Sequence, residues 1–391
     1  MSKEIQQEAA RYLPNKELRH LMLMNKESQD NLQDVMAEWR VKQVKIYDLF
    51  VFDQFRARRQ LLSDLHQAKE QGAQVSLRLN YVTNDDIYAI KDYLDIVVHL
   101  ELHSYSTSPR ISGLTKDGIG YLTHAVNLQD LTISSMIADH LNPLVALAHL
   151  NTLNLINCEN IDFDSVSKMI PRLRKLSFRG TDIKDLDTLL ASAANLQELS
   201  ISSMIANKLG ALVKLTHLKT LRLLKCTNLD CDSIKNMSWL HELDLSGSDI
   251  AQVDFLPSLP HLKILKLRNT KIDNLEPIST SRNLHTLDLS GPGEVDLKDF
   301  AILSQLRKLY LAEKTITNLY ILEKLLFLKK LDLKESTIVN SDSHEDKDKH
   351  ILCFNLGNLQ KLRLPCGGIT CFEGNEPIVN LEVLEVPPKT R

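Results

Sequence analysis

The sequence predicts an α/β solenoid, a stack of short repeats whose strands form one parallel sheet. The pattern LxxLxL recurs along most of the chain, and in each copy leucines alternate with polar residues, as in Leu243-Asp244-Leu245. Alternation with a period of two is typical of a short strand that is buried on one face. A fixed longer period is typical of repeat proteins, in which neighbouring units bury each other's apolar side chains.

The repeat is located by its first leucine. Successive copies lie 22 or 23 residues apart, except for one step of 31 from Leu328 to Leu359. That step contains the charged run SDSHEDKDK at 341–349, which we interpret as a loop inserted into one repeat. The first leucines are Leu128, Leu150, Leu173, Leu196, Leu218, Leu240, Leu262, Leu284, Leu306, Leu328, Leu359 and Leu381.

These leucines are numerous enough to form a core without a metal or a disulfide. Each buried leucine stabilises the folded state by about 1.5–3 kcal/mol. Another apolar residue, such as Ile250 or Ile272, follows each strand after a few positions. The rest of each repeat must return the chain to the next strand.

The repeats resemble the leucine-rich-repeat family, as LHELDLSGSDIAQVDFLPSLPH at 240–261 illustrates. Their length is similar to that of the internalin and phosphatase-regulator classes. The resemblance covers about residues 97–386. It implies a right-handed solenoid (a horseshoe) with a parallel β-sheet on the concave face, short helical turns on the convex side, and an N-terminal helical region.

The asparagine that usually follows the strand in this family is replaced by small residues. A small donor can still satisfy a turn carbonyl from inside the solenoid, so we expect the same fold with a less regular turn ladder. We expect the two cysteines among these residues to be buried and therefore inert. The replacements are Cys158, Thr181, Cys226, Ser248, Thr270, Thr315 and Thr337.

Three regions are expected along the chain. Residues 1–40 do not fit the repeat and should form a helical cap. Residues 41–127 look like longer, irregular first repeats, and residues 128–391 contain the regular ones.

The stretch EIQQEAARYLPNKELRHLMLMNKES in the first region resembles the F-box, a helical motif that docks on the adaptor of a cullin-based ubiquitin ligase. Two departures matter: no Leu-Pro precedes Glu4, and Glu27 and Ser28 stand where an aromatic residue usually follows the lysine. A plain polar-faced cap of the solenoid would show the same amphipathic pattern. The resemblance implies adaptor contacts at Leu13, Pro14, Leu18, Leu21 and Leu23.

No catalytic signature is present. The sequence lacks a glycine-rich phosphate loop, HExxH and GxSxG. Cys366 and Cys371 have no second ligand pair, and His344, Asp346, Asp348 and His350 are better explained as a solvated loop. We therefore expect a binding protein without a cofactor or a metal, and not an enzyme.

The candidate binding residues lie between and beside the strand leucines, where they all face one way. The N-terminal half of this face is small and hydroxyl-rich, whereas the C-terminal half carries mixed charge and suits an extended protein partner. Ordinary solvated strand positions are the alternative explanation. The candidates are Arg222, Asp244, Lys266, Arg268, Asp288, Tyr310, Asp332, Lys334 and Arg363, and the position before the second leucine adds Lys308, Lys330 and Lys361.

Composition narrows the partners and the location. The net charge of −3 favours neither nucleic acid nor an anionic membrane. The start MSKEIQQEAARYL lacks the apolar run of a signal peptide, and the six cysteines show no disulfide-scaffold spacing. We expect a cytoplasmic protein, or one in a host cytoplasm if the chain is a bacterial effector.

The leading hypothesis is a protein-interaction receptor whose concave face holds a partner. If the start of the chain is an F-box, it links that partner to a ubiquitin ligase. The alternative is a regulatory or scaffold leucine-rich-repeat protein without a ligase link.

Overall fold

The computed structural model describes residues 41–43, 47–48, 54–104, 114–181, 183, 186–206, 209–339, 358–364 and 383–385. The expected cap at 1–40, with its F-box-like residues, lies outside these ranges. The same holds for the charged run at 341–349, for His350 and for Cys366 and Cys371.

The chain divides into two compact units. Unit 1 comprises Met1–Thr152 and Cys158–Ser165, and unit 2 comprises Leu153–Asn157 and Val166–Arg391. Strand β6 (Thr152–Ile156) and helix α7 (Phe163–Met169) contain residues of both.

In unit 1, the strands pair in parallel: β1 and β2 with β3, β3 with β4, and β4 with β5. Leu77 pairs with Leu100, and Leu100 with Leu131, so the second-leucine position continues through these longer repeats. The elements in order are β1 (Val41–Gln43), β2 (Tyr47–Asp48), α4 (Gln54–Glu70), β3 (Gln74–Asn80), α5 (Asn84–Ile90), η1 (Lys91–Ile96), β4 (Val97–His103), α6 (Lys116–Tyr121), η2 (Leu122–His124), β5 (Asp130–Ser134) and η3 (Asn142–Ala146).

In unit 2, a parallel sheet runs from β6 through β7, β8, β9, β10, β11, β12, β14, β16 and β18 to β19. A second sheet of β13, β15 and β17 lies in the return segments of three later repeats. The strands are β7 (Lys175–Arg179), β8 (Glu198–Ser202), β9 (Thr220–Leu224), β10 (Glu242–Asp244), β11 (Ile264–Lys266), β12 (Thr286–Asp288), β13 (Glu294–Asp296), β14 (Lys308–Tyr310), β15 (Thr315–Thr317), β16 (Lys330–Asp332), β17 (Thr337–Val339), β18 (Lys361–Arg363) and β19 (Val383–Glu385).

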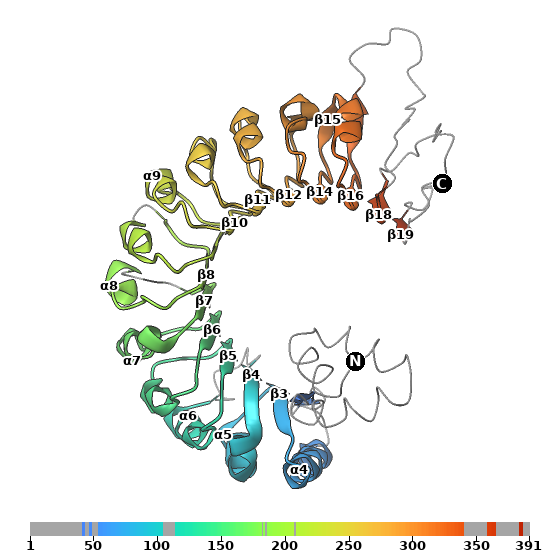
Figure 1. The fold of residues 1–391 in the computed structure, drawn as a ribbon. Coiled ribbons are helices and arrows are strands. Elements are labelled where there is room, and N and C mark those ends of the chain that lie inside the picture. The colour runs from blue at the N-terminus through green and yellow to red at the C-terminus, as the bar shows by residue number, and fades with distance from the viewer. Residues whose placement is uncertain are drawn as a thin grey trace, which may run out of the picture. The chain divides into compact units, whose positions relative to one another are not determined.

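Short helical turns return the chain between the strands of unit 2. Figure 1 shows the strands on the inner side of this unit and the turns on its outer side. Proline near the start of η4, η6 and η7 suits a helical first turn, because its fixed φ is already helical. The turns are η4 (Ile170–Arg172), α8 (Leu186–Leu190), η5 (Gly210–Lys214), α9 (Cys231–Lys235), η6 (Leu256–Ser258), η7 (Glu276–Thr280), η8 (Leu297–Phe300) and η9 (Leu319–Lys324).

The strand register confirms the repeat. Leu243 pairs with Leu265, and Leu265 with Leu287, so the second leucine of each repeat occupies the same position in the sheet. These leucines are fully buried, as are the first and third leucines of the same repeats. The core is therefore continuous along unit 2, as the LxxLxL pattern predicts.

In the main sheet of unit 2, each strand from β6 to β16 is followed by a residue in the left-handed conformation. Glycine is favoured where the turns of neighbouring repeats touch. A Cβ on Gly291 (φ +114) would lie 2.2 Å from Oδ1 of Asn269 and 3.0 Å from the backbone of Asn269. The left-handed residues are Asn157, Gly180, Ser203, Lys225, Gly247, Asn269, Gly291, Glu313 and Glu335.

The small residues in the turns after the strands, which form the turn ladder, were expected to make hydrogen bonds inside the solenoid, and this expectation is met in part. The Ser248 hydroxyl accepts from the backbone N–H of Cys226 at 2.9 Å and donates to the carbonyl of Leu223 at 2.7 Å, so it ties two repeats together. Cys158 and Cys226 are buried, as expected. Burial raises the pKa of the Cys226 thiol, which disfavours the reactive thiolate.

The assignment of Thr315 and Thr337 to this ladder is wrong. The pairing of Leu309 with Leu331 places Lys314 and Ser336, one residue earlier, at the position of Ser248. The two threonines instead begin β15 and β17. Ser336 donates its hydroxyl to the carbonyl of Leu333 at 2.7 Å. Lys314 is buried and donates its ammonium to the carbonyl of Pro292 at 3.0 Å.

Candidate functional site

The side chains that alternate with the buried leucines of unit 2 form a surface that we call the strand face. Its first row, just before the second leucine, includes Glu198, Thr220, Glu242, Ile264, Thr286, Lys308, Lys330 and Lys361. Its second row, just after that leucine, includes Ser200, Arg222, Asp244, Lys266, Asp288, Tyr310, Asp332 and Arg363. The structure thus aligns seven of the predicted binding residues in one row, and Arg268 and Lys334 follow two residues after Lys266 and Asp332.

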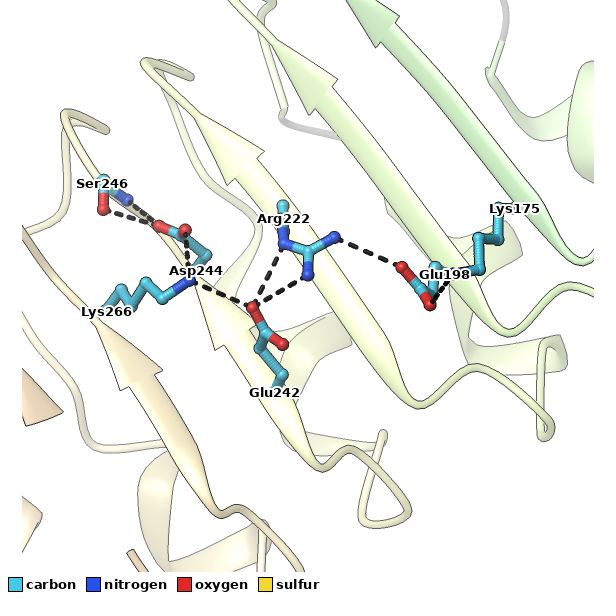
Figure 2. Close-up of polar contacts among 7 residues, drawn as sticks. All are labelled: Lys175, Glu198, Arg222, Glu242, Asp244, Ser246 and Lys266. Carbon is cyan, nitrogen blue, oxygen red and sulfur yellow. Dashed lines mark hydrogen bonds and ion pairs between the residues drawn. The ribbon is translucent and has the colours of Figure 1, made fainter. Parts of the chain in front are cut away.

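A continuous set of ion pairs crosses β7 to β11 (Figure 2). We call it the charge network, made of Lys175, Glu198, Arg222, Glu242, Asp244 and Lys266. Arg222 lies between two carboxylates, 3.5 Å from Glu198 and 3.1 Å from Glu242. Lys175 contacts the far side of Glu198 at 2.8 Å.

Glu242 is the centre of the charge network. Its Oε1 accepts from Nε of Arg222 at 3.2 Å and from Nζ of Lys266 at 3.2 Å. Its side chain is only 13% exposed. Lys266 also lies 3.6 Å from Asp244. Four charges on three neighbouring strands are therefore compensated within the protein, which limits the rotamers of every member.

The predicted aspartates of the strand face share a structural role. Asp244, Asp288 and Asp332 each accept a hydrogen bond from the backbone N–H two residues later, at 3.1, 3.0 and 3.2 Å. This contact is an Asx turn, which ends a strand by satisfying a backbone donor that the sheet leaves free. The sequence-based prediction treated these residues only as a binding surface.

The strand face of β14, β16 and β18 is different in charge. Lys308, Lys330 and Lys361 stand next to one another in register, and we call them the lysine row. Nζ of Lys330 lies 4.8 Å from the ring centroid of Tyr310, a cation–π contact. Arg363 pairs with Asp332 at 3.1 Å, and Lys334 pairs with Glu335 at 3.1 Å.

Several cations of the strand face make no side-chain hydrogen bond or ion pair within the described part of the chain; Lys330 is one, and its side chain makes the cation–π contact with Tyr310. Arg179, Arg268, Lys308 and Lys361 are the exposed ones. Just before β14 and β16, the exposed Arg307 and Lys329 add positive charge without a side-chain partner among the described residues.

The sequence-based prediction missed Lys175, Glu198 and Glu242, which belong to the charge network. All three precede the second leucine of their repeats, the position that also holds Lys308, Lys330 and Lys361. Reading that position along every repeat would have identified them.

The strand face of unit 1 carries its own polar cluster. Arg78 of β3 pairs with Glu101 of β4, which also lies 3.4 Å from His103. The hydrogen bond from Arg78 is the largest influence on Glu101 and lowers the pKa of that carboxyl. On the neighbouring strand pair, His99 contacts Asp130.

Within the described residues, no group of three or more His, Cys, Asp or Glu side chains could hold a metal ion. Among the helices that the structure describes, none combines the length and apolar character needed to span a bilayer.

The comparisons with known proteins address the fold. No protein-family model matches the sequence, and no curated protein matches it. An internalin from Listeria monocytogenes aligns with a TM-score of 0.51 at 18% identity, over 72% of this chain and 88% of its own. A leucine-rich-repeat protein from Leptospira interrogans aligns with a TM-score of 0.53 at 18% identity, over 81% of this chain and 80% of its own.

The repeat register and the parallel sheet indicate the same fold as the two similar structures. The predicted fold class is confirmed: the chain has the α/β fold of a leucine-rich-repeat solenoid.

Proposed function

We propose that this chain is a protein-interaction receptor that binds a protein partner on the strand face of unit 2. The observation that carries the proposal is the register of the sheet, which aligns charged side chains in two rows from β8 to β18. Eight strands about 4.8 Å apart give rows roughly 34 Å long. A surface of this length suits an extended partner rather than a small molecule, which needs a concave pocket.

Pre-ordering of the side chains supports the proposal. Binding costs free energy when long, flexible side chains must be immobilised at an interface. Arg222 and Lys266 are already held by Glu242, and Arg363 is held by Asp332. A partner that binds these side chains therefore has fewer flexible groups to immobilise, and the free-energy cost of binding is smaller.

The link to a ubiquitin ligase and the cytoplasmic location remain predictions from the sequence. The support for the link is the F-box-like match at Leu13, Pro14, Leu18, Leu21 and Leu23, outside the described residues. Without that link, the same strand face supports the alternative, a regulatory or scaffold protein.

Site-specific photocrosslinking tests the proposal. A photoreactive amino acid is placed at Arg268 or Lys334, which are exposed on the strand face, in a lysate from the source organism or its host. The matched controls are Ser258 of η6 and Thr280 of η7, exposed on the outer turns. We expect the same protein to be captured through both strand-face positions and through neither control. Capture only through the outer turns, or no shared protein at the strand-face positions, would refute the proposal.

A further inference from the structure

The lysine row is an uncompensated line of positive charge. Lys308, Lys330 and Lys361 occupy directly paired positions on three neighbouring parallel strands. Adjacent strands are about 4.8 Å apart, and like charges at paired positions of a sheet are destabilising. The long side chains relieve part of this repulsion by spreading into water. No carboxylate within the described residues pairs with any of the three.

The neighbouring carboxylates are occupied elsewhere. Asp332 receives the Arg363 guanidinium and the backbone N–H of Lys334. Glu335 pairs with Lys334. Asp288, on β12, accepts the backbone N–H of Ser290. The net result on β14, β16 and β18 is a surface whose cations exceed its anions, in a chain whose overall net charge is −3.

We propose that β14, β16 and β18 dock an acidic, extended segment of a partner protein, whose carboxylates lie between the lysines of the lysine row. The proposal rests on the proposed function and specifies the chemistry of the partner at this end of the strand face. A carboxylate between two lysines on adjacent strands contacts both and removes their mutual repulsion. Arg307 and Lys329 extend the positive field at the start of the same strands.

A protein segment fits this surface better than a nucleic acid. Single-stranded nucleic acid is held by a basic groove together with exposed aromatic rings on which bases stack. Tyr310, the aromatic residue of this part of the strand face, already carries Lys330 over its ring. Asp288 and Asp332 interrupt the basic surface at the second row and would repel a phosphate backbone. A peptide can place its carboxylates at the lysines and its neutral residues at the aspartates.

The test measures fluorescence anisotropy of the purified full chain with three labelled probes at low ionic strength. The probes are a peptide of about twelve residues in which glutamate alternates with serine, the same peptide with glutamine for glutamate, and a single-stranded oligonucleotide; an extended peptide of this length spans about 40 Å. The variant is Lys308→Gln/Lys330→Gln/Lys361→Gln. The matched control, Lys214→Gln/Lys271→Gln/Lys298→Gln, removes three exposed lysines outside the strand face and changes the net charge equally.

We expect the glutamate peptide to bind the unchanged chain and the control alike, and to bind the lysine-row variant about tenfold more weakly. Replacement of the same three lysines by arginine should restore binding, which shows that the loss comes from charge and not from misfolding. Equal binding of the glutamine peptide, equal weakening in the control, or tighter binding of the oligonucleotide would overturn the proposal. Photocrosslinking at Arg268 and Lys334 can still capture a partner when the glutamate peptide does not bind. That pair of results would refute the acidic segment and leave the proposed function standing.

Discussion

The charge network and the lysine row lie on the same sheet, yet their charges are balanced differently. From β7 to β11, carboxylates of the charge network alternate with cations on neighbouring strands, so each member of the network finds its partner inside the protein. From β14 to β18, lysine follows lysine in the first row. Since the backbone scaffold is the same, the residues on either side of the second leucine decide whether a stretch of the strand face is compensated or open.

Under the proposed function, this difference gives the two stretches different roles. A compensated surface is rigid and weakly attractive to a charged partner, because its charges already interact with one another. An open row attracts opposite charge over a Debye length of about 10 Å in 0.1 M salt. The charge network would therefore position a partner, and the lysine row would attract it. Changes of charge should then shift stability in opposite directions at the two ends.

The largest stability effect is expected in the charge network. Glu242→Gln keeps the shape but leaves Arg222 and Lys266 without their shared carboxylate. We expect the free energy of unfolding to fall by about 1–2 kcal/mol, since hydrogen bonds to partly buried charges contribute about that much. Urea unfolding followed by circular dichroism measures it. Glu323→Gln, at an exposed glutamate of η9, is the control. An unchanged midpoint for Glu242→Gln would show that the network adds no stability.

A smaller change of opposite sign is expected in the lysine row. Lys308→Gln/Lys361→Gln leaves Lys330 alone in the row and removes the repulsion between neighbours. We expect the free energy of unfolding to rise by about 0.5 kcal/mol at low ionic strength and the gain to disappear in about 1 M salt. The same urea titration at two salt concentrations measures it. Destabilisation at low salt would mean that these lysines are compensated after all.

Lys314 belongs to neither group, because its ammonium is buried and is hydrogen-bonded to a backbone carbonyl. Burial lowers the pKa of its ammonium below the ordinary value of 10.5. The unfolded chain therefore binds this proton more tightly, and the contribution of Lys314 to stability rises as pH increases through the window between the lowered pKa and 10.5. Lys314→Met removes this dependence, so the unchanged chain should gain stability relative to the variant as pH rises. Parallel pH profiles of the melting temperature would contradict the expectation.

The repeat period in the sequence predicted which strand residues are buried and which lie on the strand face. The second leucines from Leu176 to Leu384 pair with one another from strand to strand, as the repeat requires. The nine predicted binding residues all follow these leucines on the strand face. The roles of those residues were harder to predict. Asp244 ends its strand with an Asx turn and also contacts Lys266, and only the coordinates show both contacts.

By itself, the sequence determined the fold class, the repeat, the buried leucines and the face on which the polar strand residues lie. These follow from local periodicity, since a strand exposes alternate residues wherever it occurs. The tertiary structure alone decided which charges compensate one another, which residue fills each turn and where Lys314 is buried. Such pairings join residues about 22 positions apart, and side-chain reach across neighbouring strands sets them, which no local pattern contains.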